Sequence, residues 1–191
     1  MNAIYVAGTD EVGRGPLAGS VTAASLVFPP AYKNPKITDS KKLSPKKRDA
    51  LFDEIKTEAV AYSIVSVGPR RIEKINIREA SRLAMKLSLE RVEKKISGKI
   101  HVLIDGNTGL ETNLPQETII KGDSKIISIA GASILAKVAR DRLMELLEEK
   151  YPGYGFKGHK GYPTKTHREA IKEIGPSLAH RRTFSGVSQF I

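Results

Sequence analysis

The sequence predicts an α/β protein in which one five-stranded sheet packs with helices. Five short apolar runs have the lengths and residue types of strands. Several longer stretches carry helix-start signals followed by apolar residues at helical spacing. No internal repeat interrupts this pattern, and 191 residues with 40% hydrophobic content suffice for one sizeable core. We therefore expect a single domain over residues 1–191, with a distinct C-terminal part from about residue 152.

The five expected strands are spread along the first two thirds of the chain. Residues 4–7 are expected to form a buried strand, and residues 20–28 form another after a glycine-rich turn. Residues 61–67 alternate in the manner of a strand, so they are expected to extend the first two into an antiparallel meander. Residues 100–104 and 117–121 supply the fourth and fifth strands.

Two helices are expected before the fourth strand. Ser44 is a suitable N-cap and Pro45 suits the first helical position, so a helix is predicted to run to about residue 60. Asn76 is predicted to cap a long helix that ends at Gly98.

Two further helices are expected after the fifth strand. Residues 128–150 begin with many small side chains, which would let this helix lie close on the sheet. Thr166 and Glu169 fit a capping box for a last helix that ends near Gly175.

Composition limits the compartment and the kinds of site. The chain has no cysteine, which excludes disulfides and thiolate metal sites, so any metal must be bound through oxygen or histidine. No stretch approaches the ~20 apolar residues of a membrane span, and no signal sequence precedes the first strand. We expect a cytoplasmic protein with no membrane partner. A monomer is expected because no long apolar or heptad stripe is present.

The net charge points to a polyanionic partner. The chain has 32 basic and 21 acidic residues, a net charge of +11. Nucleic acid is the leading candidate for such a partner. The alternative is a lysine-rich surface that only keeps the protein soluble.

Four acidic residues follow apolar strands. Asp10 and Glu11 follow the first, Asp105 the fourth and Asp123 the fifth. A sheet that places these strands side by side would gather four carboxylates, which repel one another unless a hard divalent cation lies between them. Mg²⁺ is the first choice and Mn²⁺ the second. Two such ions can activate water and stabilise the leaving oxygen during hydrolysis of a phosphodiester.

A Gly-Arg-Gly turn (Gly13, Arg14 and Gly15) follows the first two acids. Glycine permits positive φ angles and the close approach of another molecule, and Arg14 adds a cation. The alternative is a plain hairpin turn with solvated acids.

Two other segments carry residues suited to nucleic acid. Ser40, Lys41 and Lys42 precede a helix start, where ammonium and backbone N–H groups can hold a phosphate, or they form a solvated loop. Tyr162 lies among glycines and lysines, where its ring can stack on a sugar or base or pack on its own loop.

The remaining polar candidates are weaker. His159 and His167 have no partner at metal-ligand spacing, so we expect surface or hydrogen-bonded histidines. The basic segment 180–184 is expected either to lie along a phosphate or to be solvated.

Six motifs resemble the ribonuclease HII family, or type 2 ribonuclease H, and occur in the family's order. They are residues 10–19 (DEVGRGPLAG), 39–43 (DSKKL), 104–107 (IDGN), 121–124 (KGDS), 132–141 (ASILAKVARD) and Gly161-Tyr162 with His167. The resemblance implies a ribonuclease H-like mixed five-stranded sheet flanked by helices, with a small C-terminal helical extension.

The resemblance also implies an activity. An enzyme of this family hydrolyses the RNA strand of RNA/DNA hybrids and incises DNA duplexes with embedded ribonucleotides on the 5′ side of a single ribonucleotide. Metal-ion catalysis leaves 3′-OH and 5′-phosphate ends. By the family pattern, Asp10, Glu11, Asp105 and Asp123 are the catalytic and metal-binding set.

Substrate contacts follow from the same resemblance. The Gly-Arg-Gly turn would contact the ribose 2′-OH, the group that distinguishes RNA from DNA. Tyr162 matches a tyrosine that stacks on the following deoxyribose. The residues that resemble phosphate contacts are Ser40, Lys41 and Lys42.

The chain starts at its first strand, without the N-terminal substrate-binding domain of the related ribonuclease HIII, and its Gly-Arg-Gly turn also favours type 2. The segment after Pro176 matches no motif with a definite role. Two alternatives stay open. One is a nuclease of the same fold that acts on DNA, and the other is a non-catalytic basic module that binds nucleic acid.

Overall fold

The fold is built on a mixed five-stranded sheet with the order β3-β2-β1-β4-β5. The computed structural model describes residues 4–191, so residues 1–3 of the expected domain lie outside the described residues. The antiparallel meander of β1, β2 and β3 is confirmed, and β4 and β5 run parallel to β1. The strands are β1 (Ile4–Val12), β2 (Val21–Val27), β3 (Ala61–Val67), β4 (Lys99–Asp105) and β5 (Gln116–Ile119).

The central strand β1 is longer than the predicted run of residues 4–7. Asp10 and Glu11 therefore lie within β1 and not beyond its end. Pairing with β4 stops at Thr9, but β2 continues opposite both acids with Ala24 and Ala23. Because successive side chains of a strand point to opposite faces, Asp10 and Glu11 project toward different layers of helices.

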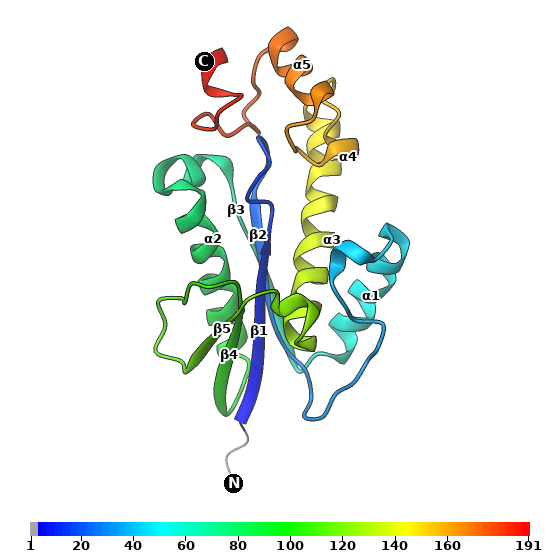
Figure 1. Cartoon of the computed structure of the whole chain (residues 1–191), viewed down its shortest axis with the longest axis vertical. Helices are drawn as coiled ribbons and strands as arrows, with labels where there is room; N and C mark the ends of the chain where they lie inside the picture. The colour runs from blue at the N-terminus through cyan, green and yellow to red at the C-terminus, as the bar shows by residue number, and fades with distance from the viewer. Residues whose placement is uncertain (1–3) are drawn as a thin grey trace.

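Helices cover both faces of the sheet (Figure 1). The long helix α2 (Pro69–Glu93) covers one face, while α3 (Ile127–Lys150) and α1 (Pro45–Glu58) cover the other. The expected close packing of α3 is confirmed, since a Cβ added to Gly131 would lie 2.8 Å from a Leu26 methyl carbon. Among residues 4–191, no helix has both the length and the apolar character needed to cross a membrane.

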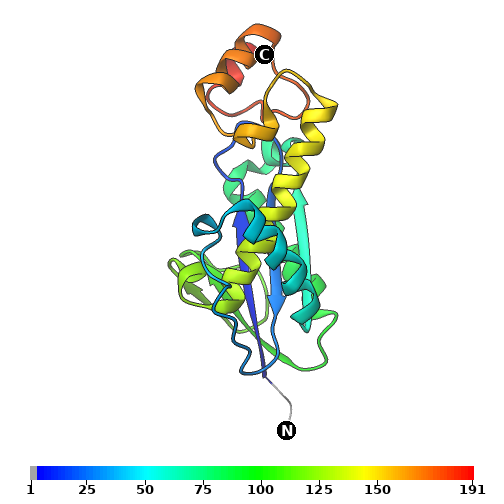
Figure 2. The same ribbon diagram turned by 90° about the vertical axis from the view of Figure 1, so that its right-hand side faces the viewer.

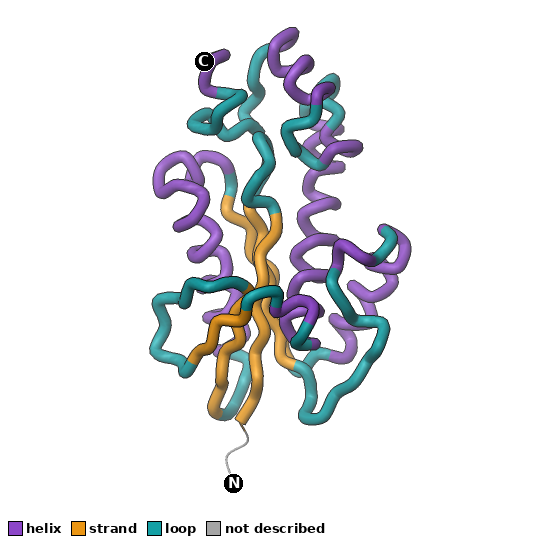
Figure 3. The backbone as a smooth tube through the Cα atoms, viewed as in Figure 1, coloured by secondary structure: helices purple, strands orange, loops and turns teal. Residues whose placement is uncertain are grey.

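The helical C-terminal part lies at one end of the sheet, where α3 extends past the strands (Figures 2 and 3). It contains α4 (Phe156–His159) and α5 (Lys165–Ile174). Leu17 and Ala18, from the segment after β1, are buried in the same small core. The other members of this core are Met144, Tyr154, Phe156, Ile171, Ala179 and Val187.

The starts of α1 and α2 test two of the capping predictions. Ser44 caps α1 as predicted, because its hydroxyl accepts a hydrogen bond from the Lys47 N–H at 3.4 Å. Asn76 does not begin α2, which starts at Pro69, but its φ of 62° interrupts the helix and its Oδ1 accepts from the Glu79 N–H at 3.1 Å. It therefore caps only the second part of α2.

Two predicted helix boundaries were wrong, the end of α2 and the start of α5, whereas the predicted end of α5 near Gly175 is confirmed. α2 ends at Glu93 and does not reach Gly98. The cap of α5 is Thr164 and not Thr166, because the Thr164 hydroxyl accepts from the His167 N–H at 3.3 Å. This earlier start places the imidazole of His167 within 2.9 Å of the Tyr162 carbonyl oxygen, a tertiary contact that a local capping pattern does not contain.

Candidate active site

Asp10 and Asp105 are neighbours at the point where β1 and β4 stop pairing. The last parallel pair is Thr9 with Ile104, so the next residue of each strand is an aspartate. The Asp105 carboxylate accepts a hydrogen bond from the Gly122 N–H at 2.7 Å. This contact ties the end of β4 to η2 (Gly122–Ser124), the short turn that contains Asp123.

Burial and mutual repulsion disfavour the charged forms of these acids. Burial raises the pKa of Asp10 well above its ordinary value, and the charges of Glu11 and Asp105 raise it further. The Ser133 hydroxyl of α3 and the Glu11 N–H, which lies 2.7 Å from Oδ1, oppose this shift. Burial also raises the pKa of Glu11, although Arg14 counteracts part of the effect.

Asp123 belongs to the same electrostatic group. Burial raises its pKa, the charges of Asp105 and Asp39 raise it further, and Lys41 lowers it. Asp105 therefore interacts with each of the other three predicted acids. Asp39, which the sequence analysis did not single out as an acid of the site, is a fifth carboxylate at its border.

The donor chemistry of this group fits a hard divalent cation. The converging side chains are carboxylates that are partly removed from water, and Mg²⁺ and Mn²⁺ prefer such oxygen ligands. Within residues 4–191, however, no three acidic or histidine side chains are close enough to form a ready-made metal site. The residues that would hold such a cation are Asp10, Glu11, Asp105 and Asp123.

The Gly-Arg-Gly turn lies directly after these acids. Gly13 has a φ of 93°, and a Cβ at this position would lie 2.2 Å from Nε of Arg140, so glycine is required on both grounds. Arg14 and Gly15 are exposed. Nη1 of Arg14 lies 3.4 Å from a Glu11 carboxylate oxygen, which links the turn to the acids.

Tyr162 lies next to the Gly-Arg-Gly turn although the two are far apart in sequence. A Cβ at Gly15 would be 3.7 Å from Cε1 of the tyrosine ring. The Leu17 N–H donates to the Gly161 carbonyl at 2.8 Å, which holds the two segments together. Tyr162 is 40% exposed, so part of this residue is accessible to another molecule. The structure thus brings Tyr162, the turn and the acids to one surface.

The segment 40–42 forms the short helix η1 (Ser40–Lys42) beside the acids. Ser40 is buried, and its hydroxyl lies 3.0 Å from that of Ser133, which lowers the pKa of Asp10. Lys41 and Lys42 are exposed. Arg48 fixes η1, because Nη1 donates to the carbonyls of Ser40 and Leu43 at 2.9 and 2.6 Å.

Two arginines are buried although their local sequence did not predict it. Arg140 and Arg181 are both 0% exposed, and their guanidinium groups bind backbone carbonyls around the Gly-Arg-Gly turn. The tail segment 180–184 was predicted to be solvated or to follow a phosphate, which is wrong for His180 and Arg181, since both are buried. His167 is hydrogen-bonded, as one of the two alternatives predicted, and it is buried. A charged residue in the small-residue stretch of α3 was the only local signal for Arg140.

A pocket of about 330 Å³ lies on the α2 side of the acids. Glu11 and Asp105 line it together with Arg14, Arg78 and Ser81. Among residues 4–191, no acid forms an ion pair with Arg78, and the buried Ser81 hydroxyl has no hydrogen-bond partner. The pocket therefore contains a guanidinium and a hydroxyl group that are available to bind another molecule.

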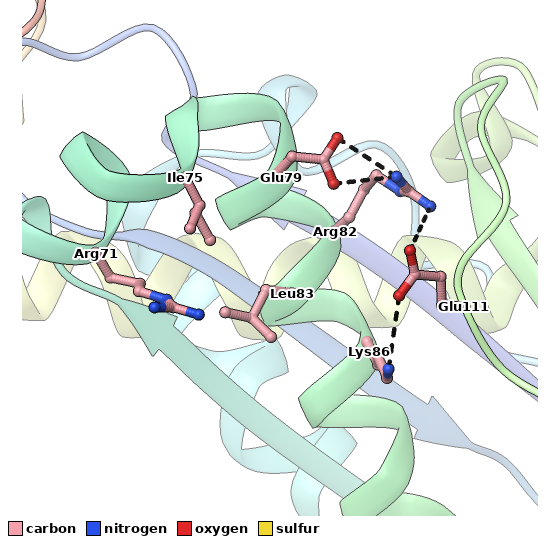
Figure 4. Close-up of a pocket in the computed structure, with 7 residues that line it drawn as sticks. All are labelled: Arg71, Ile75, Glu79, Arg82, Leu83, Lys86 and Glu111. Atoms are coloured by element: carbon pink, nitrogen blue, oxygen red, sulfur yellow. Dashed lines mark hydrogen bonds and ion pairs between the residues drawn. The ribbon is translucent and has the colours of Figure 1, made fainter.

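A second pocket, of about 320 Å³, lies on the outer side of α2 (Figure 4). Here Arg82 bonds Glu79 at 3.1 Å and lies 3.9 Å from Glu111, which also lies 3.9 Å from Lys86. Most charges of this pocket are thus paired with one another. Glu111 belongs to the loop between β4 and β5, so the network attaches that loop to α2.

A mixed sheet of this order, flanked by helices and with Asp10 and Asp105 adjacent where β1 and β4 stop pairing, is a ribonuclease H-like fold. The family model for ribonuclease HII matches residues 7–187. The chain belongs to the ribonuclease HII family and is a ribonuclease H, a hydrolase. Membership favours an enzyme over a non-catalytic binding module.

Curated relatives share nearly the full length of the chain. Ribonuclease HII of Syntrophotalea carbinolica is 45% identical over 186 residues, which cover 97% of this chain and 88% of that protein. Ribonuclease HII of Neisseria meningitidis serogroup A is 48% identical over 193 residues, with coverages of 98% and 96%.

Solved structures share the fold. The crystal structure of ribonuclease H2 from Pyrococcus horikoshii superposes with a TM-score of 0.82 at 26% identity, covering 97% of this chain and 96% of that one. Bst-RNase HIII in complex with Mn²⁺ gives a TM-score of 0.70 at 17% identity, covering 98% of this chain and 69% of that one. The second likeness shows the fold alone.

Proposed function

We propose that this ribonuclease H incises duplex DNA on the 5′ side of single embedded ribonucleotides, as well as cutting the RNA strand of RNA/DNA hybrids. Hydrolysis would leave 3′-OH and 5′-phosphate ends. The observation that supports this proposal is the closeness of the Gly-Arg-Gly turn to Tyr162, next to the acids. A Cβ added at Gly15 would lie 3.7 Å from Cε1 of the Tyr162 ring.

The Gly-Arg-Gly turn is suited to reading a sugar. Gly15 has no side chain and is exposed, so a ribose can approach its backbone closely. A 2′-OH both donates and accepts hydrogen bonds, which makes it the group that separates RNA from DNA at such a contact. The ring of Tyr162 offers a stacking surface for the next sugar along the strand.

Asp10, Glu11, Asp105 and Asp123 would hold Mg²⁺ or Mn²⁺. When bound, the cation supplies activation of water and stabilisation of the leaving oxygen. The chain's own residues prepare this site. The Glu11 N–H orients Asp10, and the Gly122 N–H orients Asp105.

Exposed cations would hold the substrate backbone beside these acids. Lys41 lies close enough to Asp123 to lower its pKa, and Lys42 follows it on the surface. Ammonium groups in such positions bind phosphate as point charges. The net charge of +11 supports attraction of a polyanionic duplex.

The deciding experiment is cleavage of a DNA duplex that contains one ribonucleotide, with Mg²⁺, with Mn²⁺ and without metal. An all-DNA duplex of the same sequence and the variant Asp10→Asn are the controls. We expect metal-dependent incision 5′ of the ribonucleotide, and mapping of the ends gives the chemistry. Cutting of the all-DNA duplex would instead favour a DNA nuclease of the same fold.

A further inference from the structure

Arg181 is a fully buried arginine whose side-chain hydrogen bonds go to backbone carbonyls and whose guanidinium lies 5.0 Å from the centroid of the Phe184 ring. Nη2 donates to the Gly13 carbonyl at 2.6 Å, Nη1 to that of Arg14 at 2.9 Å and Nε to that of Gly19 at 2.9 Å. Within residues 4–191, no carboxylate lies within ion-pair distance of its guanidinium. A buried charge without a counterion is costly, so its geometry needs an explanation.

These bonds fix the direction of two peptide groups. The structure has no cis peptide bond among the described residues, and the C=O and N–H of a trans peptide point in opposite directions. Because Arg181 holds the carbonyls of Gly13 and Arg14 inward, the N–H groups of Arg14 and Gly15 face away from it. No backbone carbonyl of residues 4–191 accepts a hydrogen bond from either N–H.

The tail backbone holds the same segment in place. The Arg181 N–H donates to the Leu17 carbonyl at 2.8 Å, and the Gly19 N–H donates to the Ala179 carbonyl at 2.8 Å. Ala18 and His180 form an antiparallel bridge between these two bonds. The tail therefore continues the pairing of the segment that contains the Gly-Arg-Gly turn.

His180 connects the tail to Tyr162. The Ser177 N–H donates to Nδ1 of His180 at 3.0 Å, so Nε2 of His180 carries its hydrogen and donates to Nε2 of His167 at 3.1 Å. Nδ1 of His167 must then be protonated and donates to the Tyr162 carbonyl at 2.9 Å. One directed chain of hydrogen bonds thus runs from the tail to the loop that carries Tyr162.

We propose that the tail segment 177–181 positions the substrate-reading surface, with Arg181 as the positioning residue that turns the N–H groups of Arg14 and Gly15 toward the sugar of the substrate. Its neighbour His180 sets the position of Tyr162 through His167. This inference rests on the proposed function and assigns a role to the segment after Pro176.

Lysine cannot replace Arg181 in this role. A guanidinium presents its donors in a rigid planar fork, whereas an ammonium is a point donor on a flexible stem. Arg181→Lys keeps the charge but loses the simultaneous bonds to Gly13 and Arg14. Arg182→Lys is the matched control, because Arg182 is the adjacent residue and is exposed.

The test measures selectivity and folding together. Dissociation constants are measured without metal for a DNA duplex with one ribonucleotide and for the all-DNA duplex, and the melting temperature is measured for each variant. We expect Arg181→Lys to lose about tenfold in the ratio of the two constants, because two hydrogen bonds to the sugar are misdirected. Arg182→Lys should keep the wild-type ratio.

A folded Arg181→Lys variant with the wild-type ratio would overturn the positioning role. Metal-dependent cutting by the wild type is measured in parallel, so failure of the proposed function is distinguished from failure of this inference. The wild type also gives a test that does not depend on a variant's folding. Its Arg14 and Gly15 amide NMR signals should respond to the ribonucleotide-containing duplex more than to all-DNA, and an equal response contradicts the proposal.

Discussion

Asp10 and Asp105 follow the last parallel pair of β1 and β4, so the sheet itself brings their carboxylates together. Their closeness raises the pKa of Asp10 beyond the effect of burial alone. The folded chain therefore keeps like charges close together where β1 and β4 stop pairing. Such unfavourable interactions are characteristic of functional sites, where residues needed for activity can lower the stability of the fold.

Asp10→Asn should abolish cleavage and stabilise the protein. The substitution removes a charge from a buried site where other acids repel it, while the amide keeps the shape of the side chain. We expect activity to fall by on the order of 10³-fold or more. The free energy of unfolding without metal should rise by about 1–2 kcal/mol at pH 8. Cleavage assays and urea unfolding measure the two effects.

Asp53→Asn is the matched control for this prediction. Asp53 lies on α1 with a side chain that is 72% exposed, and it is not one of the predicted site acids. Activity and stability should both be unchanged. Full activity of Asp10→Asn would contradict the assignment of Asp10 to the metal site.

Metal should stabilise the protein more at high pH than at low pH. The pKa values of Asp10, Glu11 and Asp123 are raised by folding, so their favourable contribution is complete below the ordinary carboxylate pKa and is lost as the pH rises through the folded value. A divalent cation relieves this repulsion. At 100 times its Kd it should add about 2.7 kcal/mol.

Thermal unfolding with Mn²⁺ and with a chelator, at pH 8 and pH 5, measures this effect. The melting temperature should increase with metal at pH 8 and increase less at pH 5, where protons compete with the cation. An equal increase at both values would show that the metal binds away from these carboxylates.

The convergence of the acids could be predicted from sequence because each lies shortly after a recognisable apolar run. The length of β1 could not, since Gly8 and Thr9 break the apolar run and the residues that extend the pairing, Ala23 and Ala24, come from β2. A strand's end depends on its neighbour as much as on its own residues.

The buried arginines were beyond sequence reasoning for a similar reason. Nothing in the local sequence distinguishes the buried Arg181 from the exposed Arg182. The carbonyls that bind Arg181 belong to Gly13, Arg14 and Gly19, more than 160 residues earlier in the chain. Only the folded chain brings these donors and acceptors together.

Tyr162→Ala should reduce the preference for a junction between RNA and DNA more than it reduces stability. Tyr162 is 40% exposed, so it is not a core residue, but a stacking interaction worth about 1–3 kcal/mol would disappear. Tyr162→Phe keeps the ring and should retain the preference. Cleavage rates on junction and uniform hybrid substrates give the ratio. An unchanged ratio for the alanine variant would exclude stacking on the substrate.

Arg78→Gln should weaken substrate binding and reduce its salt dependence. Arg78 lines the pocket beside Glu11 and Asp105, where its guanidinium is available to a backbone phosphate. Losing one phosphate contact lowers the slope of log affinity against log salt by about 1. Arg91→Gln, an exposed change at the other end of α2, should leave the slope unchanged. Equal slopes for both variants would place Arg78 outside the binding surface.

Acid should destabilise the protein through His167 and His180. Burial lowers the pKa of each to about 4, from an ordinary value of 6.5. The unfolded chain therefore binds protons that the folded chain excludes between these values, so stability is complete above pH 6.5 and declines as the pH falls toward 4. Between pH 7 and pH 5, one such histidine should account for about 2 kcal/mol.

His180→Asn isolates this contribution. Its amide oxygen can still accept from the Ser177 N–H, but the side chain no longer titrates. Urea unfolding at several pH values should show a smaller decline in stability with acid for the variant than for the wild type. The comparison is needed because the acids of the active site change stability in the opposite direction over the same range. Parallel pH profiles would show that His180 is not a source of the acid sensitivity.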